Sequence, residues 1–217
     1  MAKSISLYQI YYKDEQKEQI YDFAIPYFNT VLTPYFENAV ISELVPKSNA
    51  DFISVCSWRL KKKRGDCFRL PDKTLTLEKI ENADFDIAIL TPRSPTHDVM
   101  GMAAHWHGKA WTDAIEELKK KIKIPKKVNY AIYENHFIAR KDIYSSYVLD
   151  CLNPCIEFMH TNSVFHVDSG YNRRKSKSEV LEYEKKTGRK DWPISPFVLE
   201  RLFSIYINDK DFKVINL

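Results

Sequence analysis

The feature that most restricts the fold of this chain is a repeated alternation of strand-like and helix-like segments. Short runs of β-branched and aromatic residues match strands, and segments with apolar residues at helical spacing lie between them. A chain of 217 residues, 44% of them hydrophobic, can bury one sizeable core. Alternating strands and helices are typical of a mainly parallel sheet flanked by helices. We therefore expect a single α/β domain that spans residues 1–217.

The expected strands are 5–12, 51–58, 85–90, 128–139 and 212–217. The expected helices are 15–23, 37–44, 76–82, 111–122, 143–152, 179–186 and 197–207. A loop is expected over 26–36 because Pro26 and Pro34 interrupt it. The pattern of 97–106 does not decide between a helix and a strand. Ser195 before Pro196 is typical of a helix start.

Composition and local hydropathy argue against several classes of protein. Only five glycines are present, so a glycine-rich phosphate loop is not expected. The longest apolar runs, such as 87–90, are far too short to span a bilayer. The first residues lead directly into a strand-like segment and lack the apolar region of a signal peptide. These features predict a cytoplasmic protein.

The net charge of +4 is mild, but basic residues gather at 61–64, 119–127 and 173–175. Such runs are usually solvated faces. They could also attract a phosphate-bearing ligand or an anionic membrane surface, so peripheral membrane association stays an open alternative. Nucleic acid is not an expected partner, because no helix-turn-helix, zinc-finger or aromatic RNA-binding signature accompanies the charge.

The four cysteines do not form a recognisable metal motif. Cys56 lies in an apolar run, and Cys151 and Cys155 are separated by Leu-Asn-Pro, which suggests the end of a helix. Neither spacing matches a zinc pair, and no second pair accompanies them. We expect buried thiols with a structural role.

Residues near the ends of the expected strands carry the chemistry of a ligand site. In an open parallel sheet, ligands bind outside the carboxyl ends of the strands. Aromatic rings stack on bases and sugars, arginine pairs with phosphate, and asparagine reads hydroxyls as both donor and acceptor. This set suits a nucleotide-sugar. The residues at the strand ends are Tyr11 and Tyr12, 57–59, 91–93, and Asn135 with His136. The candidates for substrate binding from the strand segments are Gln9, Tyr11, Trp58, Arg59, Asn135 and His136.

Five segments, in the same order, resemble a known family. Residues 50–59, ADFISVCSWR, are similar to the ADYIGLCHYR segment of a bacterial glycosyltransferase-like family encoded in capsule and surface-polysaccharide gene clusters. Residues 133–138, YENHFI, resemble its CNMFI strand, and residues 197–206, FVLERLFSIY, resemble its closing ERLLNIYL helix. Residues 85–90 and 105–107 stand in the places of its next strand and of a His-containing segment.

The resemblance implies a GT-A-like fold and the transfer of a sugar from a nucleotide-sugar donor to a saccharide acceptor. It also implies that the segment around Asn135 contacts the donor sugar. The chain departs from the family at Ser57, which stands where the HYR motif has histidine.

Metal dependence is open in the sequence. GT-A enzymes bind Mn²⁺ or Mg²⁺ through an Asp-x-Asp motif, and Asp84-Phe85-Asp86 is the credible literal match. This match lies before its strand and would therefore face the opposite edge of the sheet. Arg59 could neutralise the diphosphate in place of a metal.

Three histidines form a competing constellation. His105 and His107 would share one face of a strand but not of a helix, and His97 lies nearby in sequence. A zinc site built on them would make the protein a His-dependent metal hydrolase. The alternative is that His105 or His107 hydrogen-bonds the donor phosphate or an acceptor hydroxyl, or has no role.

Glu200 and Arg201 are adjacent charges in an apolar helix, so they must either pair or reach a cleft. If they reach a cleft, Glu200 could be the base for the acceptor hydroxyl, with Glu134 as the alternative carboxylate. If they pair, they form a structural salt bridge. A further alternative for the whole chain is a non-catalytic binding or scaffold protein that keeps the transferase fold.

Overall fold

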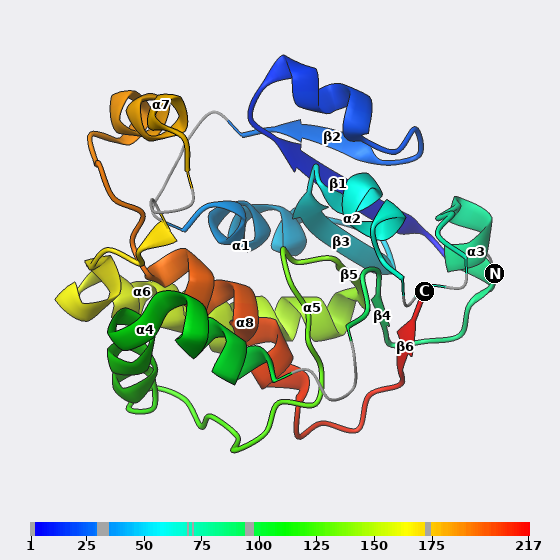
Figure 1. The fold of residues 1–217 in the computed structure, drawn as a ribbon. Helices are drawn as coiled ribbons and strands as arrows, with labels where there is room; N and C mark the ends of the chain where they lie inside the picture. Colours follow the sequence, from blue (N-terminus) through cyan, green and yellow to red (C-terminus); the bar gives the residue numbers. More distant parts are fainter. Residues whose placement is uncertain (1–2, 30–34, 69, 71, 94–97, 172–174) are drawn as a thin grey trace.

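The computed structural model describes residues 3–29, 35–68, 70, 72–93, 98–171 and 175–217, and these form a six-stranded sheet flanked by helices (Figure 1). The strands are β1 (Ile5–Tyr11), β2 (Ile25–Phe28), β3 (Phe52–Ser57), β4 (Ile87–Ile89), β5 (Phe137–Arg140) and β6 (Val214–Asn216). Their order is β2-β1-β3-β5-β4-β6. β5 pairs antiparallel with both neighbours, and the other pairs are parallel. The α/β class is confirmed, and the sheet is mixed because β5 is reversed.

The helices are α1 (Glu37–Lys47), α2 (Leu60–Gly65), α3 (Leu77–Asn82), α4 (Val99–Leu118), α5 (Lys141–Tyr147), α6 (Asn153–His160), α7 (Lys177–Thr187) and α8 (Ser195–Ile207). Short 3₁₀ turns cover Asp14–Gln19 and Ser163–His166, and a π-helical turn covers Val148–Leu152. Within the described ranges, no helix combines the length and the apolar character needed to cross a bilayer.

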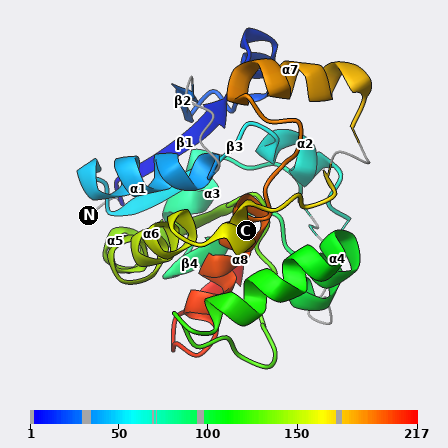
Figure 2. The same cartoon turned by 90° about the vertical axis from the view of Figure 1, so that its left-hand side faces the viewer.

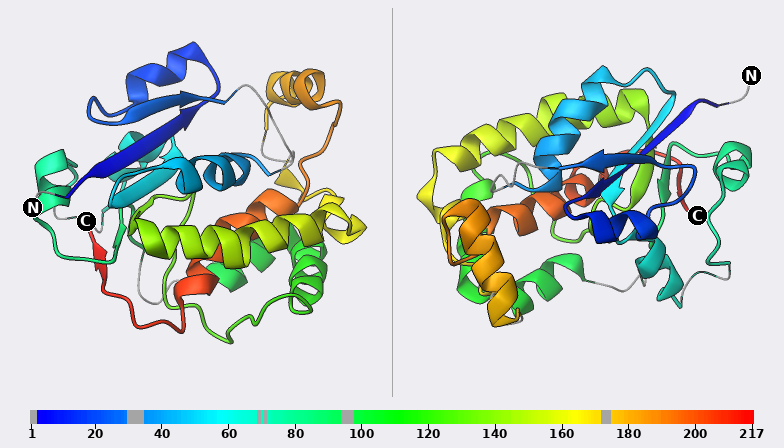
Figure 3. Two further views of the ribbon diagram at one scale, coloured as in Figure 1. Left: turned by 180° about the vertical axis from the view of Figure 1, so that it is seen from behind. Right: turned by 90° about the horizontal axis from the view of Figure 1, so that it is seen from above.

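The two faces of the sheet carry two hydrophobic clusters. Because side chains alternate along a strand, Leu7 and Tyr11 of β1 point to one face and Ile10 points to the other. The face with Leu7 is covered by the Asp14–Gln19 turn, α2 and α3. The face with Ile10 is covered by α1, α4, α5, α6 and α8, which form the larger layer (Figure 3).

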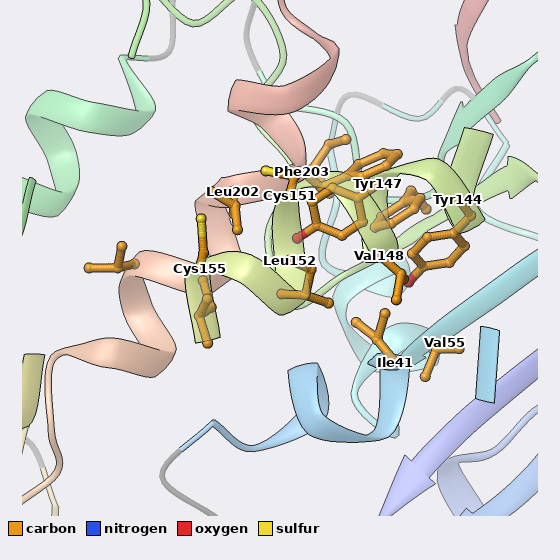
Figure 4. Close-up of a cluster of buried hydrophobic side chains, with 14 of the residues drawn as sticks. Ile41, Val55, Tyr144, Tyr147, Val148, Cys151, Leu152, Cys155, Leu202 and Phe203 are labelled. Carbon is orange, nitrogen blue, oxygen red and sulfur yellow. The ribbon is translucent and has the colours of Figure 1, made fainter. Parts of the chain in front are cut away.

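Aromatic packing fixes α8 on this larger face. The ring of Phe203 stacks on Phe137 of β5 with centroids 3.8 Å apart, and Tyr147 of α5 meets Phe203 edge-on at 4.9 Å. Phe203 is only 1% exposed, and Figure 4 shows it with Leu202 among the side chains of α5 and the π-helical turn. The stack ties α8 directly to β5, and it thereby fixes where the charged pair of α8 lies relative to the sheet edge.

The expectation that the helix after β5 ends near residue 152 is wrong. α5 passes through the π-helical turn directly into α6. Pro154 lies in the first turn of α6, just after the π-helical turn. Proline has no backbone N–H, so it cannot make the hydrogen bond of a regular helix, and the wider π-helical turn accommodates its ring. Cys151 and Cys155 are therefore one turn apart in a continuous helical run, and both are buried free thiols, as is Cys56.

Three other segments differ from the expectation. The segment 15–23 forms only the 3₁₀ turn Asp14–Gln19, and the expected loop at 26–36 contains the edge strand β2, where Pro26 is tolerated. The undecided segment is helical from Val99, capped by Asp98, whose carboxylate accepts from the N–H groups of Met100 and Gly101. The expected helix 111–122 is the second half of α4, beyond a kink at Gly108 (φ 56°).

The expected strand 128–139 is reduced to the four residues of β5. Its first half is largely buried but irregular, because Glu134 and Asn135 take left-handed backbone conformations with φ of 52° and 54°. Two such residues in succession turn the chain and end any extended run. β5 then starts at Phe137 and runs against β3 and β4.

Candidate functional site

A pocket of about 680 Å³ opens at the edge of the sheet where β1 and β3 end and β5 begins. Its volume is in the range of sites for small molecules and cofactors, roughly 300–1,000 Å³. It is lined from α1, α2, α4, α7 and α8 as well as from the sheet edge. The carboxyl edge of the parallel strands is where ligands bind in open α/β sheets. Because β5 is reversed, the residues that precede it also lie at this edge.

The basic side of the pocket is formed by Arg59, Lys63 and Arg93. Arg59 follows β3 closely, and Lys63 lies one turn later in α2. Arg59 Nη1 is 3.8 Å and Lys63 Nζ is 3.4 Å from Glu134 Oε1. The guanidinium of Arg93 lies over the ring of Tyr133 at 5.4 Å. With three cations and one close carboxylate, this side of the pocket keeps an excess of positive charge.

The left-handed turn at Glu134 and Asn135 is held by a side chain from α8. The backbone N–H of Glu134 donates to Glu200 Oε1 at 2.6 Å, and the N–H of His136 donates to the carbonyl of Tyr133 at 3.0 Å. A non-glycine residue in this conformation costs about 1 kcal/mol or more, and such strain is typical of functional sites. The turn places Asn135, which is only 3% exposed, in the wall of the pocket.

Glu200 and Arg201 form an ion pair with each other, and both side chains also line the pocket. The guanidinium of Arg201 is buried, donates to the carbonyl of Phe197 at 3.1 Å, and lies over the ring of Tyr133 at 4.9 Å. Glu200 Oε2 accepts from Arg201, and Oε1 accepts from the N–H of Glu134. Both carboxylate oxygens of Glu200 are therefore engaged in holding the site together.

Three further carboxyl groups line the pocket and are absent from the candidates predicted from the sequence: Glu37, Glu179 and Glu182. Glu37 is the first residue of α1, and its side chain lies beside the hydroxyl of Tyr12. Burial, with the nearby carboxylates of Glu134 and Glu200, raises the pKa of Glu37. An acidic residue in the first turn of a helix is common for reasons of the helix dipole, so its sequence position gave no functional signal.

The remaining wall of the pocket is a segment that extends from the body of the protein and carries α7. We call residues 167–171 and 175–194 the α7 arm. Its neck is closed by two backbone hydrogen bonds, from Ser169 N–H to the Trp192 carbonyl at 2.8 Å and from Ile194 N–H to the Val167 carbonyl at 3.0 Å. Figure 2 shows α7 at the end of this arm, on the side of the molecule where β1 ends. The ring of Tyr183 on α7 stacks on Trp192 with centroids 3.8 Å apart, and both line the pocket.

The α7 arm is joined to the body near the pocket mouth by an ion pair. Lys13 Nζ, just after β1, is 2.6 Å from Glu182 Oε2 of α7. Both side chains are about two-fifths exposed, so this pair is weak on its own, roughly 1 kcal/mol or less. Tyr183 adds a ring contact to Phe36, with centroids 6.5 Å apart.

Seven of the residues proposed from the sequence meet in this pocket. They are Trp58, Arg59, His107, Glu134, Asn135, Glu200 and Arg201. They come from four separate segments of the chain: the end of β3, the helix α4, the turn before β5, and α8.

Four other proposed substrate-binding residues do not line the pocket. Gln9 and Tyr11 point to the opposite face of the sheet, where the amide of Gln9 is bonded to backbone of Tyr21 and Ser57. Tyr12, the other tyrosine at the end of this strand, lines the pocket. His105 is exposed on α4 and lies off the pocket wall.

His136 lies behind the pocket and is 1% exposed. Its Nδ1 is 3.3 Å from the Thr91 hydroxyl, and its Nε2 is 3.9 Å from Glu134 Oε2. Burial lowers the pKa of His136 to about 3, so the ring is neutral at ordinary pH. It supports the turn that carries Glu134 and Asn135 rather than contacting a ligand.

The histidines of α4 do not assemble a metal site. His107 donates from Nδ1 to the carbonyl of Ser169 at 2.9 Å and packs on Phe197, whereas His105 is two positions away on a helix and so points elsewhere. His97 lies outside the described residues. These contacts give His107 a positioning role at the neck of the α7 arm.

Asp84 and Asp86 lie before β4, at the edge of the sheet opposite the pocket. Asp84 pairs with Lys213 at 2.5 Å, and Asp86 pairs with Arg140 at 2.7 Å. Within the described part of the chain, no group of three His, Cys, Asp or Glu side chains is arranged to hold a metal ion. These donors do not fit Mn²⁺ or Mg²⁺, so no step proposed below passes through a metal.

Comparisons of the chain with protein-family models, with curated proteins and with solved structures find no match. The function proposed below is therefore inferred from the chemistry of the pocket itself.

Proposed function

We propose that this protein transfers a sugar from a nucleotide-sugar donor to a hydroxyl of a saccharide acceptor. One observation carries the proposal: Arg59, Asn135 and Glu200, which come from three distant segments, line the same pocket at the edge of the sheet. A mixed α/β sheet with one reversed strand is compatible with the GT-A-like fold that the sequence resemblance implies.

The basic side of the pocket suits the diphosphate of such a donor. Guanidinium groups form paired hydrogen bonds to phosphate oxygens, and an ammonium group adds a point charge. Arg59, Lys63 and Arg93 would neutralise the diphosphate and stabilise the charge that develops on it as the sugar leaves. The nearby Glu134 keeps Arg59 and Lys63 in place when the pocket holds no ligand.

The other walls suit rings and hydroxyl groups. Tyr12, Trp58 and Tyr133 present aromatic surface for a base or a sugar, and Trp106 lies at the rim on α4. The amide of Asn135 offers both a donor and an acceptor to a sugar hydroxyl. The support is therefore a pocket that combines phosphate-binding, stacking and hydroxyl-reading groups.

The test is thermal unfolding of the purified protein with a panel of UDP-, GDP-, CDP- and TDP-sugars, each with and without Mn²⁺. A ligand present at about 100 times its Kd stabilises the folded state by about 2.7 kcal/mol, so one member of the panel should raise the melting temperature clearly. The same donor at the same concentration should stabilise the variant Arg59→Ala clearly less than the wild type. If no member of the panel raises the melting temperature at millimolar concentration, the proposal is wrong.

A second candidate is a binding protein that holds the nucleotide-sugar without turning it over. The observation that favours it is that Glu134 and Glu200, the two carboxylates proposed as bases, are both held in ion pairs. Release of nucleoside diphosphate from a donor that binds would exclude this candidate.

A further inference from the structure

Five carboxyl groups line the pocket, and the surroundings of Glu37 differ from those of the other four. On α7, Glu179 pairs with Lys175 and Glu182 pairs with Lys13. Glu134 lies between the cations of Arg59 and Lys63, and Glu200 lies against the guanidinium of Arg201. Glu37 has no ion-pair partner among the residues that the structure describes. Its neighbour is the hydroxyl of Tyr12.

The backbone just before Glu37 is strained in a way that directs this side chain. Phe36 has φ of 47° and ψ of −127°, an unusual conformation for a residue other than glycine. Such conformations cost about 1–3 kcal/mol and persist only where the surrounding structure holds them. Here the strained residue starts α1 at the pocket wall, and both Phe36 and Glu37 line the pocket.

The electrostatic environment distinguishes Glu37 from the other carboxyl groups of the pocket. Burial is the main cause that raises the pKa of Glu37, and the charges of Glu134 and Glu200 add to it. Burial also raises the pKa of Tyr12 well above its usual range, so its hydroxyl, which lies beside Glu37, stays protonated. Carboxyl groups whose environments differ in this way commonly divide into an acid–base group and charge-holding groups.

We propose that Glu37 takes the proton from the acceptor hydroxyl during sugar transfer. This inference rests on the proposed function. As the acceptor oxygen forms its bond to the anomeric carbon, the bond from that carbon to the phosphate oxygen breaks. The electron pair leaves with the nucleoside diphosphate, whose charge the basic side of the pocket balances. The hydroxyl proton moves to the Glu37 carboxylate and later passes to solvent.

The groups that face Glu37 come from three elements. They are Tyr12 after β1, Glu134 before β5 and Glu200 from α8. Burial and the charges of Glu134 and Glu200 raise the pKa of Glu37, and they outweigh the Tyr12 hydroxyl and the backbone N–H of Glu37, which lower it. The Glu37 carboxylate is therefore a stronger base than an exposed glutamate, as proton abstraction near neutral pH requires. Glu134 and Glu200 then act as positioning residues, because Glu134 Oε1 faces Arg59 and Lys63 and the oxygens of Glu200 bond to Arg201 and to the Glu134 N–H.

The first test compares Glu37→Gln with Glu43→Gln. Glu43 lies on the same helix, is exposed, and forms an ion pair with Lys47 at 3.0 Å, so its variant is a matched control. With the donor found by thermal shift, Glu37→Gln should bind with an affinity close to that of the wild type. Its rate of nucleoside diphosphate release should fall by about 100- to 10,000-fold, the usual contribution of a general base.

The pH profile separates a catalytic role from a structural one. The wild type and Glu43→Gln should lose activity as the pH falls and Glu37 takes up a proton. Glu37→Gln should lack that acidic limb. If Glu37→Gln keeps a rate within about threefold of the wild type, or keeps the same acidic limb, the inference is overturned.

A second measurement does not depend on turnover. The carboxyl carbons of ¹³C-labelled glutamates are followed by NMR across pH, and the Glu37 signal is assigned by its loss in Glu37→Gln. We expect the Glu37 signal to titrate at a higher pH than a glutamate in a model peptide, whose pKa is about 4.3. Titration of Glu37 at or below that value would contradict the inference even if a donor binds, whereas failure of all donors to bind would reject the proposed function alone.

Discussion

The buried imidazole of His136 gives the sharpest prediction about stability, because its environment has a definite consequence for pH. In the folded protein the ring is 1% exposed and its pKa is lowered to about 3, chiefly by burial. In the unfolded chain a histidine titrates near 6.5. The unfolded state therefore takes up a proton as the pH falls through about 6.5, and the folded state does not until about pH 3.

The sign and size of the pH effect on stability follow from this difference in pKa between the two states. His136 favours the folded state fully above the unfolded pKa, and that contribution is lost as the pH falls from about 6.5 toward 3. At about pH 5 the unfolded state gains about 2 kcal/mol from protonation of this one residue, since each pKa unit is worth about 1.4 kcal/mol. A domain of this size has a total stability of roughly 5–15 kcal/mol, so the loss is measurable.

The assay is urea unfolding of the wild type and of His136→Gln, followed by tryptophan fluorescence at about pH 7.5 and about pH 5. The glutamine in this variant keeps a polar group near the Thr91 hydroxyl but does not titrate. Between the two pH values, the wild type should lose about 2 kcal/mol more stability than the variant. Equal losses in the two proteins would refute the claim that His136 is buried and neutral, whatever the absolute stability of the variant.

Three further predictions concern the pocket, the core and the strained turn. Arg59→Ala should weaken donor binding by about 10- to 100-fold in calorimetry, the value of a hydrogen bond to a charged group, whereas Arg140→Ala at the opposite edge should not. Phe203→Ala should lower the free energy of unfolding by about 3–5 kcal/mol in urea, because it empties the stack on Phe137. Asn135→Gly should keep wild-type stability and Asn135→Ala should cost about 1 kcal/mol more, since alanine disfavours φ of 54°.

The elements that the sequence predicts well are those whose patterns are local. β1 and β3 carry dense β-branched and aromatic runs, and α8 carries a start signal at Pro196 with apolar residues at helical spacing. The segment 128–139 has a comparably apolar composition, yet only its residues from Phe137 onward, together with Arg140, form β5. That outcome depends on the bond from the Glu134 N–H to Glu200, two residues that are 66 positions apart. A local pattern cannot contain such a contact.

Part of the candidate site could be predicted from the sequence. The rule for strand ends led to Arg59 and Asn135, although Asn135 lies at the start of a reversed strand rather than at the end of a parallel one. The rule gave both Tyr11 and Tyr12, and of these two Tyr12 lines the pocket. Both faces of β1 are buried, so hydrophobicity does not reveal which of two adjacent tyrosines faces the ligand.

Glu37 and the aromatic wall of the α7 arm were beyond a strand-end rule for another reason. They reach the pocket from helices that are distant in sequence, and tertiary packing alone brings them there. The strained backbone at Phe36 could not be predicted from the sequence either, because phenylalanine has no preference for positive φ.

The central claim is that the pocket at the carboxyl edge of the sheet binds a nucleotide-sugar. A crystal structure of the protein with the donor that most raises its melting temperature tests this most directly. We predict that the diphosphate lies within hydrogen-bond distance of Arg59 and Lys63, with the sugar beside Asn135 and its anomeric carbon facing Glu37. A donor bound elsewhere on the molecule, with this pocket empty, would contradict the claim.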